Sequence, residues 1–349
     1  MTKITDWIKE HRKLLLITLI AILFADILLI VIFSSKSDDK PEPKAAEKEY
    51  RAAAEITEVT SVAEVSQPAE QNVNTEPKNV SEKKSGIDTD YLPYCKASAV
   101  YSLKKGEFLY SNNINEETAP ASLTKLLTAS VALKYADADD VFTAGSELAY
   151  VNENSSLAGL AVGDSLTLRD LITGMFLASG NDAARTVAVN VARMNFPDAD
   201  LNDVEAVNCF CGLMEQFAKS IGMENSNFVS PDGWDKYDQY TTVSDLIKLT
   251  EYVMSVPELR DIVAMPQKTV YSTAGKVFTW QNSNQLLDIN GNYYCENAIG
   301  VKTGTTQNAG SCLISAFETD DDTYISVVVG CNTDNDRYDY TLNMIYQIL

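Results

Sequence analysis

The chain has 349 residues, a formal net charge of −21 and a single histidine, His11. Nucleic-acid binding needs a basic face, so this acidic balance excludes nucleic acid as a partner. Because no histidine follows residue 11, Ser-His-Asp and Cys-His catalysis and histidine-ligated metal sites are excluded from the rest of the chain. Lysine and carboxylate side chains remain as general bases, and we expect no metal and no cofactor.

An apolar run, interrupted by Thr18 and Asp26, occupies residues 14–33. Its length matches the ~20 residues that a helix needs to cross a bilayer, which predicts a transmembrane anchor. Basic residues precede the run, so residues 1–13 are expected in the cytoplasm and the rest of the chain outside the membrane, as in a single-pass protein of the cell membrane. A cleavable signal peptide is the alternative, but the run exceeds the usual ~7–15 apolar residues and no A-x-A-like site follows it.

Residues 34–88 are rich in Glu, Lys, Ser, Ala and Pro and poor in aromatic residues. Such a composition cannot bury enough apolar surface to fold and predicts a disordered, extended linker outside the membrane. Residues 89–349 then suit one large catalytic domain.

All six cysteines lie in that portion, where disulfides are permitted but not required, and their spacing fits no zinc site. We expect most to be small buried apolar residues: Cys95, Cys209, Cys211, Cys295, Cys312 and Cys331.

The first predicted elements of this domain are strands at residues 97–103 and 107–111, joined as a hairpin by a Lys-Lys-Gly turn. A helix is predicted from residue 121 to Tyr135, and Pro120 just before it places Ser122 at the helix N-terminus. Between residues 168 and 192, two helical patterns are separated by a polar Ser-Gly-Asn loop. Asp182 is placed to complement the dipole of the second helix.

Further helical patterns cover residues 209–221 and 243–254, followed by less regular sequence to about residue 294. Short strands are predicted at 298–304, 311–318 and 323–331, with a closing helix at 338–349. Strands at both ends thus flank a helical middle. The simplest architecture is a single layered α/β domain whose terminal strands join in one antiparallel sheet.

Three short motifs follow one another along the chain: Ser122-x-x-Lys125, Ser179-Gly180-Asn181 and Lys302-Thr303-Gly304. Each has an ordinary explanation alone, as a helix cap, a capped loop or a strand end. Together, in this order and at element boundaries, they are the motif set of penicillin-binding proteins and serine β-lactamases.

The sequence around the motifs resembles the D-alanyl-D-alanine carboxypeptidases of the low-molecular-mass penicillin-binding group, serine peptidase family S11. The resemblance runs from about residue 97 to the C-terminus and is carried by residues 120–125, 154–164, 179–184, 300–306 and 309–313. It implies a β-lactamase/transpeptidase-like α+β fold, with an antiparallel sheet of N- and C-terminal strands, flanking helices and a helical middle subdomain. It also implies serine carboxypeptidase activity on peptidoglycan D-Ala-D-Ala stem peptides through an acyl-serine intermediate, with β-lactams acylating the same serine.

The resemblance assigns the reacting groups. Ser122 is the expected nucleophile, with Lys125 as the base that must be neutral to take its proton. Burial and a nearby cation both lower a lysine pKa, and Lys302 is the candidate cation. Ser179 is expected to pass a proton to the leaving amine, and the Asn181 amide to hold Lys125 and a substrate carbonyl.

The substrate-binding groups are assigned in the same way. The backbone N–H groups of Ser122 and Thr305 are expected to bind the oxyanion, and Lys302 and Thr303 the terminal carboxylate. The strand ending at Gly304 is expected to pair with an extended peptide. Arg337 matches a carboxylate-binding arginine of some relatives, and the alternative is a solvated surface arginine.

The sequence departs from the family at two positions. Relatives usually carry histidines in the stretches that correspond to Asp232-Gly233 and to residues 239–242, whereas this chain has Asp232 and Gln239. Both lie outside the three motifs, so we expect little effect on activity. Many relatives also continue into a β-rich second domain and a C-terminal amphipathic helix. This chain stops at Leu349, so we expect the N-terminal helix to be its anchor.

In this fold the first and last strands are antiparallel neighbours, so the resemblance brings Cys95 and Cys331 close enough for a disulfide.

Three other functions share features of the sequence. A β-lactamase carries the same motifs, but no Glu-x-x-Leu-Asn element is present here. A wall-binding scaffold without activity would not need complete motifs, and a transpeptidase would differ only in using an amine acceptor in place of water.

Overall fold

The structure is a computed structural model that describes residues 93–349, which belong to one compact unit. The predicted anchor at residues 14–33 and the predicted linker at 34–88 lie outside the described residues. Within residues 93–349, no helix has the length and apolar character needed to cross a membrane.

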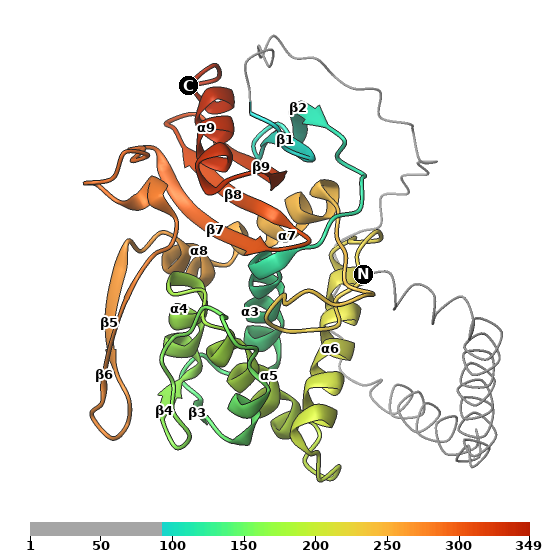
Figure 1. Ribbon diagram of the computed structural model, residues 1–349, viewed down its shortest axis with the longest axis vertical. Helices are drawn as coiled ribbons and strands as arrows, with labels where there is room; N and C mark the ends of the chain where they lie inside the picture. Colours follow the sequence, from blue (N-terminus) through green and yellow to red (C-terminus); the bar gives the residue numbers. More distant parts are fainter. Residues whose placement is uncertain (1–92) are drawn as a thin grey trace, which may run out of the picture. The chain divides into compact units, whose positions relative to one another are not determined.

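The described residues contain a five-stranded antiparallel sheet with the order β2-β1-β9-β8-β7 (Figure 1). The strand that begins the domain pairs directly with the last one, with Ala99 opposite Val327. The predicted joining of N- and C-terminal strands is therefore confirmed. The strands are β1 (Ala97–Ser102), β2 (Glu107–Asn112), β7 (Ala298–Thr306), β8 (Gly310–Glu318) and β9 (Thr323–Cys331).

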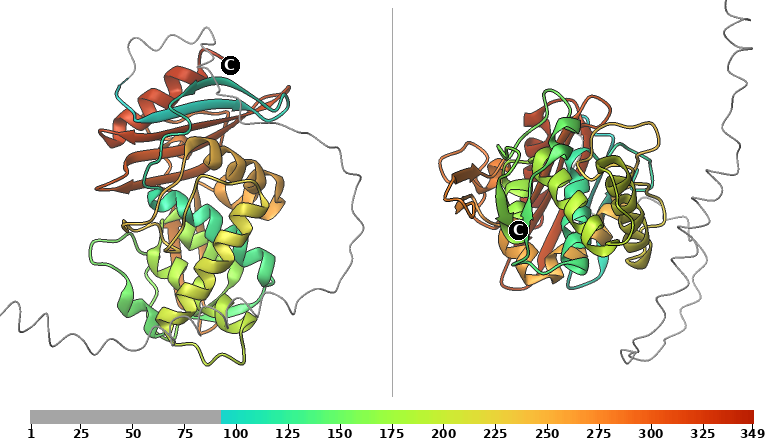
Figure 2. Two further views of the ribbon diagram at one scale, coloured as in Figure 1. Left: turned by 90° about the vertical axis from the view of Figure 1, so that its right-hand side faces the viewer. Right: turned by 90° about the horizontal axis from the view of Figure 1, so that it is seen from below.

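Alternation along the strands makes the sheet apolar on both faces. Val327 of β9 joins the core shared with the helical middle, whereas Val328 faces the opposite core, which includes Tyr338 and Met344 of α9 (Asp334–Ile345). Figure 2 shows the sheet between α9 and the helical layer. Both faces of the sheet are thus covered, and β7 is one of its two edge strands, β2 being the other.

The helical layer is built around α3 (Thr124–Tyr135), whose residues from Thr124 to Ala132 are all buried. A helix buried on every side belongs at the centre of a domain. Around it lie α4 (Leu168–Leu177), α5 (Asn181–Asn195), α6 (Asp203–Ser220), α7 (Val243–Ser255) and α8 (Pro257–Val263). Short strands and turns complete the layer: β3 (Val141–Thr143), β4 (Ser165–Thr167), β5 (Gln267–Tyr271), β6 (Val277–Gln281), η1 (Ala121–Leu123), η2 (Ser146–Tyr150) and η3 (Gln285–Leu287).

Two helices begin earlier than the apolar pattern indicates. Helix α6 begins at Asp203 rather than residue 209, and α9 at Asp334 rather than residue 338 and ends at Ile345. Both starts are capping boxes, in which Asn202 and Thr333 bind the first-turn N–H groups. Polar first turns lie outside the apolar periodicity, which explains the difference. The β5–β6 hairpin, which lies in the stretch without a clear pattern, was also not predicted.

Cys95 and Cys331 form a disulfide, as the topology of the fold predicted. The other four cysteines of the described residues are free: Cys295 and Cys312 are buried, and Cys209 and Cys211 are half-buried. The disulfide joins residues 236 positions apart, so it closes nearly the whole domain into one loop.

Replacing both Cys95 and Cys331 by Ala should destabilise the domain by about 2–5 kcal/mol, because the unfolded chain regains the freedom that the cross-link removes. Thermal unfolding should show a lower Tm by several degrees. Cys209→Ala, which removes a free thiol, serves as the control. An unchanged Tm in the double variant would show that the cross-link does not stabilise this domain.

Candidate active site

Ser122 lies in the turn η1, immediately before α3. Ala121, which precedes it, has a φ of +47°, a conformation that L-residues other than Asn and Asp seldom adopt. The turn lifts Ser122 out of the regular helix and leaves its side chain half-buried, while Ala121 and Leu123 on either side are fully buried. The predicted position of Ser122 at a helix start is confirmed, with a strained turn in place of a simple cap.

Lys125 lies in the first turn of α3 and is completely buried. Its Nζ is 2.7 Å from Ser122 Oγ and donates to the backbone carbonyl of Asp232 at 2.8 Å. Burial lowers the pKa of Lys125 to about 8, although the carboxylates of Asp232 and Asp182 oppose the shift. A buried amine in contact with a serine hydroxyl is the arrangement that a lysine base requires.

Lys302 connects the second and third motifs. It is buried, and its Nζ donates to Ser179 Oγ at 3.0 Å and to the carbonyl of Thr303 at 2.9 Å. Burial lowers the pKa of Lys302 well below its ordinary value, and the positive charges of Lys125 and Arg337 lower it further. The prediction that Lys302 lowers the pKa of Lys125 is not confirmed, because burial is what lowers it. The effect runs the other way, since the charge of Lys125 adds to the burial that lowers the pKa of Lys302.

The second motif forms the bend between α4 and α5. Ser179 has a φ of +55°, and Asn181 is the first residue of α5 and is buried. The predicted bond between the Asn181 amide and Lys125 stays a prediction. Asp182 does more than complement the helix dipole, because its carboxylate accepts from the N–H groups of residues 158–160 at 2.7–3.0 Å. It thereby fixes the loop beside the motif.

Gly304 lets strand β7 approach the nucleophile. A Cβ at this position would lie 3.1 Å from both the Ala121 Cβ and the Ser122 backbone nitrogen. The strand therefore brings the residue that follows, Thr305, to the turn that carries Ser122, as an oxyanion site formed by their two N–H groups requires. Thr303, just before it, shares a hydrogen bond of 2.6 Å with Ser283 through the two hydroxyls.

Arg337 of α9 is buried, which excludes the alternative of a solvated surface arginine. Its Nη1 donates to Thr305 Oγ1 at 3.0 Å and lies 3.4 Å from a carboxylate oxygen of Asp334. Its Nε is buried without a hydrogen-bond partner. A guanidinium that is only partly satisfied and adjoins Thr305 suits the predicted role in carboxylate binding.

The sequence motifs missed three contributors. Ser283 binds Thr303, Asp182 fixes the adjoining loop, and the loop of residues 227–240 supplies the Asp232 carbonyl to Lys125. Asp182 had a signal in the sequence as a complement to the helix dipole, and Asp232 had one as a departure from the family pattern, whereas Ser283 had none. The expectation that Asp232 has little effect on activity rested on its place outside the three motifs, yet its backbone carbonyl binds Lys125.

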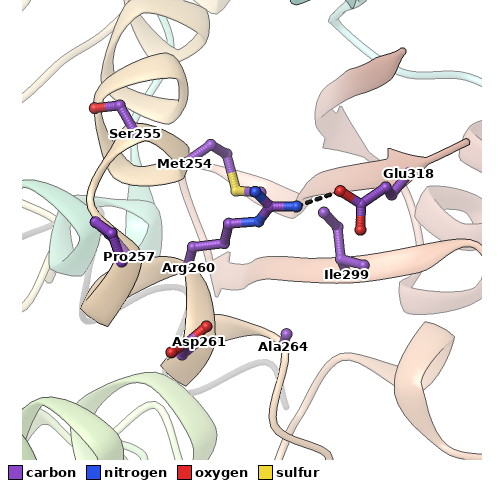
Figure 3. A pocket seen from close by; sticks show the side chains of 8 residues that line it. All are labelled: Met254, Ser255, Pro257, Arg260, Asp261, Ala264, Ile299 and Glu318. Atoms are coloured by element: carbon purple, nitrogen blue, oxygen red, sulfur yellow. Dashed lines mark hydrogen bonds and ion pairs between the residues drawn. The ribbon is translucent and has the colours of Figure 1, made fainter. Parts of the chain in front are cut away.

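A separate surface pocket lies between α7, α8 and the start of β7 (Figure 3). Arg260 forms an ion pair with Glu318 across it, beside Ile299. No motif residue lines this pocket, so it is not the reaction site. Among residues 93–349, no group of His, Cys, Asp and Glu side chains is arranged to hold a metal ion.

Comparison with known proteins agrees with this geometry. The sequence model of the family described as D-alanyl-D-alanine carboxypeptidase, peptidase family S11, matches residues 94–333. The chain therefore belongs to this family. The solved structure of the Streptomyces K15 DD-transpeptidase has a TM-score of 0.65 and 29% identity, over 73% of this chain and 97% of that one. The β-lactamase/transpeptidase-like fold is thus confirmed.

Curated relatives differ in length. D-alanyl-D-alanine carboxypeptidase DacC of Escherichia coli is 33% identical over 67% of this chain, and DacF of Bacillus subtilis is 25% identical over 73%. The chain spans 56% and 62% of the length of these two proteins. It spans 76% of the D-alanyl-D-alanine carboxypeptidase of Streptomyces sp. K15, at 32% identity over 64% of this chain.

Replacing Gly304 by Ala should slow acylation of Ser122 by penicillin about tenfold or more, because the new methyl group pushes β7 away from the turn and misplaces the reacting groups. Stopped-flow acylation kinetics would measure the effect. Gly212→Ala is the matched control, since nothing lies within 4 Å of its added Cβ. Equal rates for Gly304→Ala and wild type would refute the close-approach argument.

Proposed function

We propose that this chain is a serine-type D-alanyl-D-alanine carboxypeptidase that acts on peptidoglycan stem peptides. The observation that carries the proposal is the buried amine of Lys125, 2.7 Å from Ser122 Oγ. Family membership supports the substrate class. The hydrogen bond between Lys302 and Ser179, which connects the third motif to the second, supports the reaction type.

The reaction starts when Ser122 Oγ attacks the carbonyl carbon of the penultimate D-alanine and its proton passes to neutral Lys125. The negative charge that develops on the carbonyl oxygen is stabilised by the N–H groups of Ser122 and Thr305. The peptide C–N bond then breaks as the leaving D-alanine nitrogen takes up a proton from the Ser179 hydroxyl. Lys302 Nζ lies 3.0 Å from that hydroxyl oxygen. Water hydrolyses the acyl-serine ester and restores the free enzyme.

The substrate's terminal carboxylate is proposed to bind Lys302, Thr303 and Arg337. In the free site, burial and neighbouring cations lower the pKa of Lys302. A bound carboxylate acts in the opposite direction and favours the ammonium form. Binding of substrate and charging of Lys302 are then coupled, which favours peptides with a free C-terminal carboxylate.

We also propose that the N-terminal residues 14–33 tether the catalytic domain to the cell membrane and that residues 34–88 space it from the bilayer. The support is the length of the apolar run, the basic residues before it and the polar composition after it. An enzyme acting on peptidoglycan works outside the membrane, which agrees with this orientation.

A transpeptidase is the second candidate, because one solved structure similar to this chain is named a DD-transpeptidase. Both reactions pass through the same acyl-serine and differ only in whether water or an amine accepts the acyl group. A β-lactamase would need fast hydrolysis of the acyl-serine formed with penicillin.

The proposal is tested by incubating the full chain with an N-acylated peptide ending in D-Ala-D-Ala and measuring released D-alanine, with and without an added amine acceptor. We expect release by wild type, none by Ser122→Ala, and a stable covalent adduct between Ser122 and fluorescent penicillin. Rapid loss of the adduct would favour a β-lactamase. No adduct on folded wild-type protein would favour a scaffold without activity.

The rate of acylation by penicillin should rise with pH and level off above about 8. The neutral amine is the reactive form, and Lys125 loses its proton as the pH passes through its pKa of about 8. Below that value the rate should fall about tenfold per pH unit. Lys125→Arg, whose guanidinium stays protonated, should not be acylated at any pH in this range. A flat profile between pH 6 and 9 would show that Lys125 is not the base.

A further inference from the structure

The orientation of the Lys125 amine depends on a loop outside the three motifs. Besides Ser122 Oγ, the group that Lys125 Nζ binds is the backbone carbonyl of Asp232, at 2.8 Å. Asp232 is 1% exposed and belongs to the loop of residues 227–240 between α6 and α7. A shift of this loop would therefore rotate the amine away from Ser122.

The side chain of Asp232 anchors the same loop to helix α5. Its Oδ2 lies 2.9 Å from Arg185 Nε, and both side chains are at least nine-tenths buried. Its Oδ1 accepts from the Ser230 hydroxyl at 2.9 Å and from the Trp234 N–H at 3.0 Å. Both oxygens of the carboxylate thus have hydrogen-bond partners. Removing either the Asp232 carboxylate or the Arg185 guanidinium would leave the other as an unpaired buried charge, which is strongly unfavourable.

The ion pair also links two parts of the site. Helix α5 begins with Asn181 of the second motif, and Arg185 lies one turn further along the same helix. Through Asp232, this helix is connected to the carbonyl that holds Lys125. On its other side the loop meets η1 at Gly233, where a Cβ would lie 1.8 Å from the Ala121 carbonyl oxygen. The loop is therefore packed between α5 and the turn that carries Ser122.

Charges from several elements surround the Lys125 amine. Asp232 from the loop and Asp182 from α5 raise its pKa and oppose the effect of burial. The charge of Lys125 in turn adds to the burial that lowers the pKa of Lys302 of β7. Cys211 of α6 also lies near Arg185 and Asp232. Burial raises its pKa to about 12, so at neutral pH it adds no charge.

We propose that Arg185 and Asp232 are positioning residues that hold Lys125 in its reactive orientation and set the charge around its amine. The inference rests on the proposed function, since it assigns these residues to the same acylation step. It also gives a role to a position where relatives usually carry histidine. A histidine could not form the same acid–base ion pair with an arginine, so the pair depends on the Asp232 carboxylate.

The test compares the pH profile of acylation by penicillin for the full-length wild type, Asp232→Asn and the double variant Arg185→Met/Asp232→Asn. Both variants lack the carboxylate that raises the pKa of Lys125. We expect the rising limb to move to lower pH by about 1 unit and the plateau rate to fall about tenfold. The double variant leaves no unpaired charge, and such replacements of a buried pair by uncharged groups are often tolerated.

The matched control is Arg193→Met/Asp203→Asn, which removes the more exposed ion pair between α5 and α6, with an Arg193 Nη2 to Asp203 Oδ1 distance of 2.7 Å. It should retain the wild-type profile. Thermal unfolding shows whether the double variant folds. If it folds and its acylation rate has the same pH dependence and the same plateau as the wild type, the ion pair is only structural and the inference is overturned. If the wild type itself is not acylated, the proposed function fails first, and the inference fails with it.

Discussion

The amine of Lys125 is buried among α3, α5, β7 and the loop before α7, where an ammonium ion loses the water that would stabilise its charge. Burial lowers its pKa to about 8, so a useful fraction is neutral near neutral pH. The arrangement works only while the surrounding packing stays closed. The all-round burial of α3 and the close packing of Gly233 against η1 both keep water from the amine. The chemistry of the site thus depends on the integrity of the domain core.

Backbone strain gathers at the two serines of the site. Ala121, beside Ser122, and Ser179 both have positive φ, at about 1–3 kcal/mol each. Such conformations persist only where the surroundings over-determine them. Here Lys302 binds the Ser179 hydroxyl, and β7 packs against η1 through Gly304. Edge strand β7 therefore holds both strained turns and also carries the third motif.

Asp232 and Gln239, the two positions at which the resemblance leads one to expect histidine, lie in one loop and have complementary tasks. Gln239 accepts from the N–H groups of Val229 and Ser230, and its amide donates to the Trp234 carbonyl at 3.1 Å. It stabilises the shape of the loop, while Asp232 connects the loop to α5 and to Lys125. Because no histidine follows residue 11, the site has no imidazole, and proton transfer is left to lysine, carboxylate and hydroxyl groups and water.

The sequence by itself determined the five strands of the main sheet, the main helices and the three motifs, because apolar periodicity and turn residues are local signals and the motif residues occur at element boundaries. It also indicated, through the fold that the motifs imply, that Cys95 and Cys331 meet. It could not locate the starts of α6 and α9, since their capping residues are polar. The tertiary structure decided that Arg337 is buried beside Thr305, and that Arg185 and Asp232, 47 positions apart, form an ion pair behind Lys125. Contacts of this kind depend on how separate elements pack, and no pattern along the chain records that packing.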